Sequence, residues 1–209
     1  MSDHSPSKDF WETHYAGMDA SWAPNPNAAL KRVVASEAGM PGRALDLGCG
    51  HGADALWLAG QGWHVTAVDV SATAVARTTA RAYEANLSGR VTAIVTDLGL
   101  ETPTGTFDLV TASYFHTPLE IDRAAVLHRM ADLVSPSGLL LIVDHASVAP
   151  WSWNQHGQVF PTPQETLATL ELDQSWTSIE TAVSSRLAAG PDGETATVLE
   201  NIIAVRRIT

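Results

Sequence analysis

The chain has little basic charge and only one cysteine. Its 209 residues contain 12 lysines and arginines against 23 aspartates and glutamates, which gives a formal net charge of −11 at pH 7. Such a surface repels phosphate backbones and anionic lipid, so we expect neither nucleic acid nor a membrane as a partner. The single cysteine, Cys49, permits no disulfide within the chain, which is typical of a reducing cytoplasm.

Long apolar runs and targeting segments are lacking as well. The longest strongly apolar run, LLLIV at 139–143, is far too short to span a bilayer. The first residues, MSDHSPSKDFW, contain no apolar stretch of a secretory signal. We therefore expect a cytoplasmic protein, monomeric or homodimeric, with one domain over residues 1–209, a length that can bury a sizeable core.

Several catalytic patterns are also missing. The sequence contains no Gly-Lys-Ser/Thr end of a phosphate-binding P-loop, no G-x-S-x-G nucleophile elbow and no H-E-x-x-H zinc motif. The eight histidines form no cluster with cysteine, so we expect no metal site. No pattern of a nucleophile with its base, as acyl transfer requires, stands out in what remains.

What the sequence does contain is a glycine loop at 43–54, RALDLGCGHGAD. An apolar run leads into Gly48, Gly50 and Gly52, and the apolar stretch ALWLA follows, which predicts a strand, a tight turn and a helix. Glycines let a ligand lie against backbone N–H groups, and the helix start suits a carboxylate or phosphate. The third glycine comes one residue earlier than in the dinucleotide fingerprint G-x-G-x-x-G.

Two acidic residues flank this loop. Asp46 stands two residues before the first glycine, and Asp69 follows 23 residues later at the end of the apolar run WHVTAVDVS. An acid at the tip of the second strand of a Rossmann-like unit accepts hydrogen bonds from ribose hydroxyls. The pattern therefore favours a nucleoside, and nothing in it marks a pyrophosphate.

The rest of the chain alternates between predicted strands and helices, which indicates βαβ units with a parallel sheet. Residues 1–9 are expected to fray. We expect strands at 43–47, 63–69, 91–95, 107–113 and 139–145, with a turn at Pro136-Ser137-Gly138. We predict five helices: one capped by Asn27, one at about 53–58, one capped by Ser71, one over 120–134 and one near Pro163. The helix after Ser71 is expected to carry Val75, Thr79, Ala82 and Tyr83 on one face. The helix over 120–134 is expected to point Ala124, Leu127, Ala131 and Val134 inward. The runs SWTSIETAVSS and TATVLENIIAVRRI, on either side of Pro191-Asp192-Gly193, predict a C-terminal hairpin.

The motif D-L-G-C-G-x-G followed by V-D-V-S resembles the class I S-adenosylmethionine (SAM)-dependent methyltransferases. The segments FWETHYAGMDASWAPNPNAAL, ALDLGCGHGADALWLA, FDLVTASYFH and PSGLLLIVDH resemble the tellurite-resistance and thiopurine methyltransferase-like branch, from Phe10 to His145. The resemblance implies an α/β Rossmann-like sandwich with a mostly parallel seven-stranded sheet, an antiparallel C-terminal hairpin and helices on both faces. It also implies SAM as the cofactor and S-adenosylhomocysteine (SAH) as its product. His51 departs from the pattern, because many relatives carry an acid there.

By this resemblance, the glycine-loop amides take the carboxylate end of the cofactor, Asp69 the ribose, and Asp97 with Leu98 the adenine. Asp46 orients the loop or meets the ammonium through water, and the alternative for Asp97 is a turn cap. The residues expected around the cofactor are Trp11, Tyr15, Trp22, Asp46, Gly48, Cys49, Gly50, His51, Asp69, Val70, Asp97, Leu98, Ala112, Ser113 and His116. The aromatics of segment 1–24 could form a lid, or could simply cover a sheet edge or a helix.

The sequence gives fewer signals for the residues that would contact the methyl acceptor. Methyl transfer depends chiefly on alignment and desolvation, and a base is needed only if the acceptor must lose a proton. His116 and His145 are the candidate catalytic bases, with cofactor contact or structural hydrogen bonding as the alternative for each. We expect segment 146–165 to form an apolar acceptor wall; the candidate acceptor residues are Tyr114, Trp151, Trp153 and Phe160.

We therefore expect SAM-dependent methyl transfer to a small molecule. Two alternatives stay open: a methyltransferase for tellurite or halide-type anions, and a SAM-binding sensor or partner-binding protein without turnover. An NAD-dependent oxidoreductase would need G-x-G-x-x-G and a Tyr-x-x-x-Lys pair, and the sequence has neither.

Overall fold

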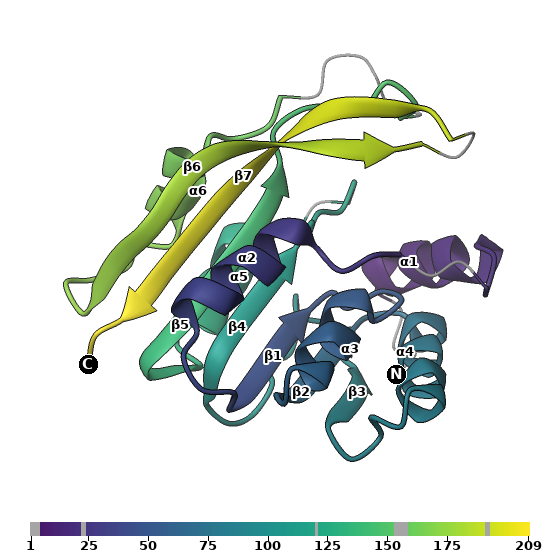
Figure 1. Cartoon of the computed structure of the whole chain (residues 1–209), viewed down its shortest axis with the longest axis horizontal. Coiled ribbons are helices and arrows are strands. Elements are labelled where there is room, and N and C mark those ends of the chain that lie inside the picture. The colour runs from purple at the N-terminus through teal and green to yellow at the C-terminus, as the bar shows by residue number, and fades with distance from the viewer. Residues whose placement is uncertain (1–4, 22–23, 120, 153–158, 191–192) are drawn as a thin grey trace.

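The computed structural model describes residues 5–21, 24–119, 121–152, 159–190 and 193–209. Within these residues, one seven-stranded sheet carries six helices (Figure 1). In chain order the elements are α1 (Pro6–Gly17), α2 (Ala28–Glu37), β1 (Arg43–Leu47), α3 (Ala53–Gly60), β2 (His64–Asp69), α4 (Ala72–Glu84), β3 (Val91–Val95), β4 (Phe107–Ser113), α5 (Arg123–Ala131), β5 (Val134–His145), α6 (Pro163–Thr169), β6 (Trp176–Ala189) and β7 (Thr195–Arg207).

The strand order of the sheet is β3-β2-β1-β4-β5-β7-β6. Strands β1 to β5 pair in parallel, and β7 runs antiparallel between β5 and β6. The predicted fold class, a mostly parallel sheet that ends in an antiparallel hairpin, is confirmed. Because the order reverses between β1 and β4, their carboxyl ends open a crevice at a topological switch point, where ligands of open α/β sheets bind.

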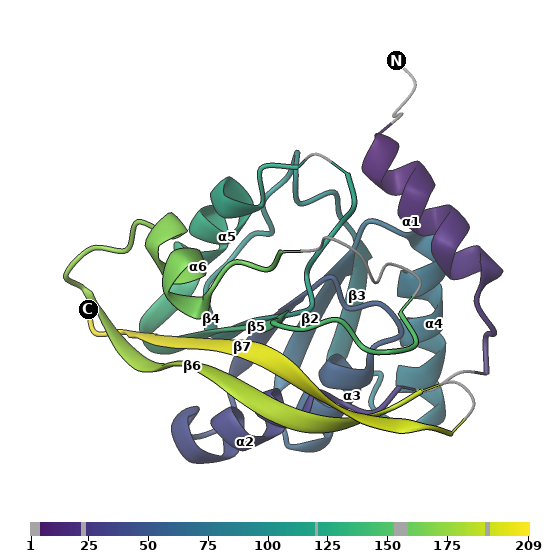
Figure 2. The same ribbon diagram turned by 90° about the horizontal axis from the view of Figure 1, so that it is seen from above.

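The sheet buries both of its faces, and this explains the unbroken apolar run of β5. Leu139 and Leu141 of β5 face the core that α2, α3 and α4 cover. Leu140 and Ile142 face the opposite core, beneath α5 and α6. Figure 2 shows the two layers, with α2 and α3 on one side of the sheet and α5 and α6 on the other.

Two helix starts are capped by the predicted residues, and a third helix begins at the predicted Pro163. The Asn27 side chain accepts hydrogen bonds from the amides of Ala29 and Leu30, and Ser71 accepts one from Ala74. At α6, Thr162 and Glu165 form a reciprocal capping box. These local signals are confirmed because capping depends on residues within one turn of each other.

The first helix begins earlier than expected. The sequence predicts fraying up to residue 9, but α1 begins at Pro6. A tertiary contact that local pattern does not reveal lies at this end, because the Ser5 hydroxyl donates a hydrogen bond to Asp97 at 2.5 Å. The Glu12 carboxylate accepts hydrogen bonds from the Ser71 hydroxyl at 2.7 Å and from the Thr73 amide at 3.1 Å, which ties α1 to the start of α4. Trp11 and Tyr15 do share a helix face, with ring centroids 6.0 Å apart.

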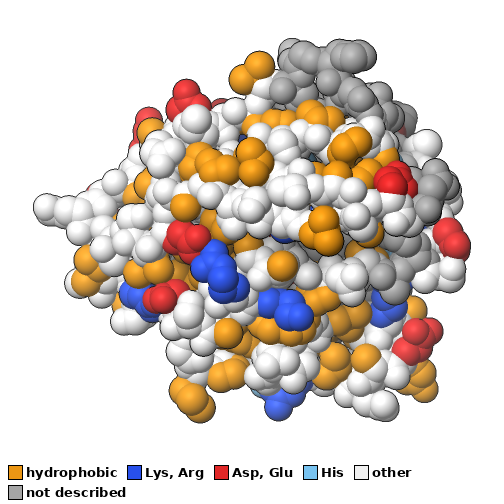
Figure 3. All heavy atoms as spheres, turned by 45° about the horizontal axis from the view of Figure 1, so that its top comes forward, with side chains coloured by type: hydrophobic (Ala, Val, Ile, Leu, Met, Phe, Trp, Pro, Cys, Tyr) orange, Lys and Arg blue, Asp and Glu red, His pale blue; other side chains and the backbone are white. Residues whose placement is uncertain are grey.

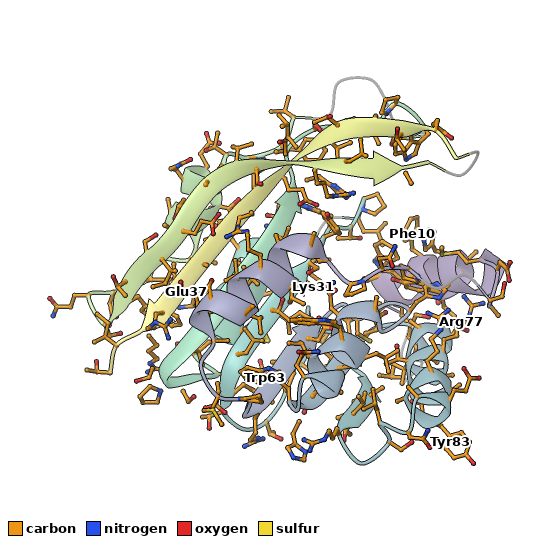
Figure 4. The ribbon with its side chains drawn as sticks, in the orientation of Figure 1. Phe10, Lys31, Glu37, Trp63, Arg77 and Tyr83 are labelled. Atoms are coloured by element: carbon orange, nitrogen blue, oxygen red, sulfur yellow. The ribbon has the colours of Figure 1, made fainter. Side chains whose placement is uncertain are left out.

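The predicted inward face of α4 is wrong. The buried residues are Ala74, Thr78 and Ala82, and only Ala82 belongs to the predicted face. Tyr83 is 77% exposed and projects outward from the end of α4 (Figure 4). Small side chains fill the inward positions because the helix lies close to the glycine loop, where the Thr78 hydroxyl donates to the Gly50 carbonyl at 3.0 Å.

Two other boundaries need correction. The helix predicted over 120–134 is α5, Arg123–Ala131, because Asp122 caps its start and Val134 already belongs to β5; Ala124 is only half-buried, and residue 120 lies outside the described residues. The turn predicted at 136–138 lies inside β5 as an irregularity, with Ser137 at φ 66°. Likewise, the hairpin turn falls on residues 191–192, outside the described residues.

The surface around the hairpin mixes charge with apolar groups. Figure 3 shows acidic, basic and apolar side chains interspersed over this face. Ion pairs join α2 to the hairpin: Arg32 lies 2.8 Å from Glu180, and Arg206 lies 3.3 Å from Glu37. None of the helices in the described ranges has the length and apolar character that crossing a bilayer would require.

Candidate functional site

The glycine loop after β1 has a backbone that only glycine tolerates easily. Gly48, Gly50 and Gly52 have φ values of 67°, 52° and 79°. Space is equally limiting, because a Cβ at Gly50 would lie 2.8 Å from the Tyr15 hydroxyl oxygen. At Gly48 a Cβ would lie 3.0 Å from the Phe115 ring. Two aromatic side chains thus lie directly against this loop.

Asp69 at the end of β2 organises the same loop. Its carboxylate accepts hydrogen bonds from the Gly50 amide at 3.0 Å and from the Ser71 amide at 2.9 Å. Burial raises the pKa of Asp69, and the amides of Ser71 and Gly50 oppose that rise. Asp69 therefore links the glycine loop to the start of α4.

A first pocket lies at the carboxyl ends of β2, β3 and β4, beside α1. Its cavity volume is about 80 Å³. Asp97 in its wall accepts hydrogen bonds from the Gly99 amide at 2.9 Å and from the Ser5 hydroxyl at 2.5 Å, so it caps a turn as well as lining the pocket. The lining residues are Ser7, Trp11, Tyr15, Gly48, Asp69, Val70, Thr96, Asp97, Leu98, Gly99, Tyr114, Phe115, His116, Thr117 and Ile121.

A second pocket lies on the other side of the glycine loop, between the start of α2 and β6. It is much larger, with a cavity volume of about 760 Å³. Its lining residues are Pro24, Asn25, Pro26, Asn27, Ala28, Asp46, Gly48, Cys49, His51, Ala53, Asp54, Ser113, Tyr114, Arg186, Leu187, Ala189 and Gly190. Gly48 and Tyr114 line both pockets, so the two meet at the first glycine of the loop.

Buried carboxyls concentrate at the loop end of the second pocket. Asp46 and Asp54 are 2% and 8% exposed. Burial raises the pKa of Asp46 well above its usual range, and the charges of Asp54 and Asp69 add to the rise. Asp46 Oδ2 and Asn27 Nδ2 are buried and make no hydrogen bond within the described residues. An unpaired acceptor and an unpaired donor therefore lie in the wall of one cavity, where each carries a desolvation cost.

Tyr114 stands at the junction in a strained conformation. Its φ of 53° lies in the left-handed region, which a bulky aromatic residue rarely adopts. Its ring stacks on His145 with centroids 4.2 Å apart, and its hydroxyl donates a hydrogen bond to Glu200. His145 of β5 and Glu200 of β7, which are paired across the two strands, thus hold Tyr114 at the place where the two pockets meet.

Comparison with known proteins gives matches to methyltransferases. A family described as a methyltransferase domain matches residues 44–138, just under half of the chain. The 27-O-demethylrifamycin SV methyltransferase of Amycolatopsis mediterranei is 36% identical over 106 residues, which are 49% of this chain and 38% of that protein. The ribosomal RNA small subunit methyltransferase C of Alcanivorax borkumensis is 42% identical over 62 residues, which are 30% of this chain and 19% of that protein. The chain therefore spans much less than two thirds of either relative.

Solved structures match over nearly the whole chain. The N-methyltransferase NodS of Bradyrhizobium japonicum, solved with S-adenosylhomocysteine, has a TM-score of 0.70 at 19% identity and covers 97% of this chain and 100% of its own. TehB of Haemophilus influenzae has a TM-score of 0.69 at 17% identity, over 96% of this chain and 67% of its own. The fold is that of the class I SAM-dependent methyltransferases.

Within this class I methyltransferase fold, His116 and His145 lie together but outside the second pocket. His116 lines the first pocket, and its Nε2 is 3.4 Å from Asp144 Oδ1. Arg123 holds that same oxygen at 2.6 Å. Burial, with the charge of Arg123, lowers the pKa of His116 to about 4. Burial, followed by the charges of His116 and Arg186, also lowers the pKa of His145 to about 4. Both rings are neutral at pH 7, and their role as bases stays a prediction.

Seven of the remaining predicted residues line one of the two pockets; three line neither, and two lie outside the described residues. Trp11, Tyr15, Val70 and Leu98 gather at the first pocket, whereas Cys49, His51 and Ser113 line the second. Ala112 is fully buried within β4, and Phe160 lies over the histidine pair, 6.1 Å from His145 by ring centroids. Trp151 is half-buried, and Trp22 and Trp153 lie outside the described residues.

His51 and Cys49 are both buried, and their role as cofactor contacts stays a prediction. The His51 ring packs edge-on against Tyr15 with centroids 5.5 Å apart, and burial, followed by the charges of Arg77 and Arg81, lowers its pKa to about 4. Figure 4 shows Arg77 on α4 beside α1. Burial raises the pKa of Cys49 well above its usual range, so its thiol stays protonated and is a poor nucleophile. In the described residues no group of three His, Cys, Asp or Glu side chains could hold a metal ion.

Several residues of the site were missed at the level of sequence. Asp54, Phe115, Arg186 and Glu200 lie at or beside the pockets, although the sequence patterns assigned them no role; Asp54 ends the glycine-loop stretch 43–54, and Phe115 lies within FDLVTASYFH. One signal was available: Arg186 is the only lysine or arginine in the run 176–189. A lone cation on a strand that flanks a crevice is a reasonable candidate for ligand recognition.

Proposed function

We propose that the chain is a cytoplasmic SAM-dependent methyltransferase with one domain, which transfers a methyl group to a small molecule. The observation that carries this proposal is the meeting of two pockets at Gly48 and Tyr114, along a glycine loop. A long, bent ligand can run through both. SAM is the cofactor that the methyltransferase-domain match and the fold support.

The first pocket suits an adenosine. Asp69 accepts hydrogen bonds from two backbone amides, and Asp97 accepts from one amide and from the Ser5 hydroxyl. Each carboxylate oxygen keeps a further lone pair for ribose or the adenine amine. Leu98 offers an apolar surface to a flat ring, since its side chain lies in the wall of the pocket.

The second pocket suits the amino-acid end. Asp46 Oδ2 can accept from an ammonium group and Asn27 Nδ2 can donate to a carboxylate, and both atoms are otherwise unpaired within the described residues. The start of α3 at Gly52 adds backbone N–H donors and the positive end of a helix dipole. The orphaned polar atoms thus fit the two charged groups of an amino acid.

Methyl transfer from SAM requires no covalent intermediate with the protein. Bound SAM supplies a methyl group on a positively charged sulfur. The chain's residues orient the reactants and exclude water at the Gly48–Tyr114 junction, because positioning and desolvation account for most of the rate in such a displacement. We infer that neutral His116 and His145 can take a proton only from an acceptor that reaches the junction at Tyr114, on whose ring His145 stacks.

The narrower proposals have weaker support. The placement in the tellurite-resistance and thiopurine branch rests on the sequence resemblance and on the fold likeness to TehB. A small-molecule acceptor is supported by the rifamycin-related relative and by the chain's net charge of −11, whereas the ribosomal RNA relative matches only 30% of the chain. Anion methylation and binding without turnover are less favoured alternatives.

A thermal-shift series with SAM, SAH, NAD and ATP tests the cofactor. We expect stabilisation by SAM and SAH alone, and stabilisation by NAD alone would overturn the proposal. A labelled-methyl assay against thiols, phenols, amines, tellurite, halide and small-subunit ribosomal RNA then tests turnover and acceptor class. Methyl transfer to an organic acceptor is the expected result; transfer only to tellurite or halide, or only to RNA, would favour the corresponding alternative.

A further inference from the structure

The second pocket has one arginine and no lysine among its described lining residues, and this arginine comes from a different element than the acids. Arg186 on β6 lines the hairpin side, whereas Asp46 and Asp54 lie by the glycine loop. Under the proposed function, the acids face the amino-acid end of the cofactor. Arg186 then faces the part of the cavity that remains for the acceptor.

The Arg186 guanidinium is held in place by contacts with Glu200 and Tyr114. Its Nε donates a hydrogen bond to Glu200, whose side chain is only 3% exposed. Glu200 also accepts from the Tyr114 hydroxyl, and the guanidinium carbon lies 5.9 Å from the centroid of the Tyr114 ring. A buried carboxylate and an aromatic face therefore fix the orientation of the cation before any ligand arrives.

The terminal nitrogens of Arg186 remain available. Among the described residues, the guanidinium makes its hydrogen bond through Nε alone. Both NH₂ groups keep their donors, and the side chain is 33% exposed, toward the cavity that it lines. Two parallel N–H donors in a fixed plane match the two oxygens of a carboxylate.

The size and walls of the cavity indicate an organic ligand. A volume of about 760 Å³ far exceeds what an inorganic oxyanion fills, even after the amino-acid end of the cofactor is placed. Pro24, Pro26, Leu187 and Ala189 supply apolar walls, against which a hydrocarbon body can pack.

We propose that Arg186, positioned by Glu200 and Tyr114, determines acceptor specificity by binding the carboxylate of an organic acid. This inference rests on the proposed function, because it assigns the rest of the second pocket to the acceptor. It names Arg186 as a binding residue and Glu200 as the positioning residue behind it.

The test measures binding to the SAH-loaded protein. A panel of aromatic and aliphatic carboxylic acids, each paired with its uncharged amide, is titrated by calorimetry at saturating SAH, with inorganic phosphate as a further probe. We expect at least one acid to bind about tenfold or more tightly than its amide, the effect of about 1.4 kcal/mol or more from a charged bidentate pair. Phosphate should compete weakly.

Three variants sharpen the result. Arg186→Gln should erase the preference for the acid over its amide, while SAH affinity stays within about twofold. Arg186→Lys should keep part of this preference, because lysine carries the charge but lacks the two parallel N–H donors of the guanidinium. Arg32→Gln is the matched control, since Arg32 pairs with Glu180 on the same strand but lines no part of this pocket. Its preference should equal that of the wild type.

The outcomes separate the two proposals. If SAH does not bind the wild type, the proposed function fails and the inference fails with it. If SAH binds but no acid is preferred over its amide, or Arg186→Gln keeps the preference, only the inference is overturned. Competition by phosphate as strong as that of the best acid would overturn the assignment to an organic acid.

Discussion

The glycine-loop side and the hairpin side of the crevice are built in different ways. On the loop side, Asp69 bonds to the Gly50 and Ser71 amides, and these residues lie within one β-α-β-α stretch. On the hairpin side, Tyr114 meets Glu200, 86 positions away in the chain. Under the proposed function, the cofactor half of the site is therefore built from contacts close in the sequence, whereas the acceptor half forms only when the whole sheet is assembled.

The largest effect should come from the loop side. Asp69→Asn keeps the shape of the side chain but removes its charge. We expect SAH affinity to fall about 10- to 150-fold, because hydrogen bonds to a charged group contribute about 1.5–3 kcal/mol. Calorimetric titration checks this. Asp108→Asn is the control, because Asp108 accepts from the Arg43 amide at the opposite end of the sheet; its SAH affinity should match the wild type. Equal affinity in Asp69→Asn would contradict the assignment.

Gly50→Ala separates backbone strain from the ligand contact. Both Gly50 and Gly39 have positive φ, but a Cβ meets the Tyr15 hydroxyl only at Gly50, and nothing lies within 4 Å at Gly39. We expect each alanine to cost about 1–2 kcal/mol of unfolding free energy from left-handed strain. In a denaturation series combined with SAH titration, only Gly50→Ala should also lose SAH affinity, by about tenfold. Equal SAH affinity in the two variants would show that the loop does not contact the ligand.

A smaller effect is expected at Trp151, on the hairpin side. A Cβ added to Gly190 would lie 2.8 Å from the Trp151 ring, so Trp151 packs against a residue that lines the second pocket. Trp151→Ala should raise the KM for the acceptor about 2- to 10-fold, from the loss of about 0.5–1.5 kcal/mol of aromatic contact, and leave SAH affinity nearly unchanged. If steady-state kinetics show no change in KM and only Tm falls, Trp151 has a packing role alone.

The smallest effect concerns pH. The pKa of His145 is lowered to about 4 in the fold, whereas an unfolded histidine titrates near about 6.5. Between these values the unfolded chain binds more protons, so the stability that the neutral ring contributes is lost as pH falls, by at most about 1.4 kcal/mol per pH unit. Glu200, whose pKa burial raises to about 7, acts in the opposite direction.

A comparison of two histidine variants isolates the contribution of His145 to the pH dependence of stability. His145→Gln should reduce the fall in Tm between pH 7 and pH 5, measured by differential scanning calorimetry. His64→Gln, at an exposed position of β2, should leave the fall as in the wild type. A His145→Gln profile that parallels the wild type would mean that the ring is not held neutral by its burial.

Sequence reasoning succeeded where structure is local. β1, β3 and β4 have the predicted bounds, because apolar runs bounded by glycines, acids and caps define buried strands. It failed where distant contacts decide. Ser5 and Glu12 tie α1 to Asp97 and to the start of α4, and Thr78 on the inner face of α4 contacts the glycine loop. None of these contacts leaves a periodic signal.

The candidate site follows the same division. The loop residues and Asp69 were predictable from spacing, and the structure gathers most of them at two joined pockets. The pair of Arg186 and Glu200 was not, because it depends on the antiparallel register. Glu200 stands opposite Ser184, and Arg186 opposite Val198, so the two charged side chains are diagonal neighbours. A shift of one residue would place them on opposite faces.

A crystal structure with SAH tests the central claim, that one ligand occupies both pockets and passes Gly48 and Tyr114. The account predicts adenine beside Asp97 and Leu98, the ribose at Asp69, and the amino-acid end at Asp46 and Asn27. SAH confined to one pocket, lying in the reverse direction, or absent from the glycine loop would contradict it.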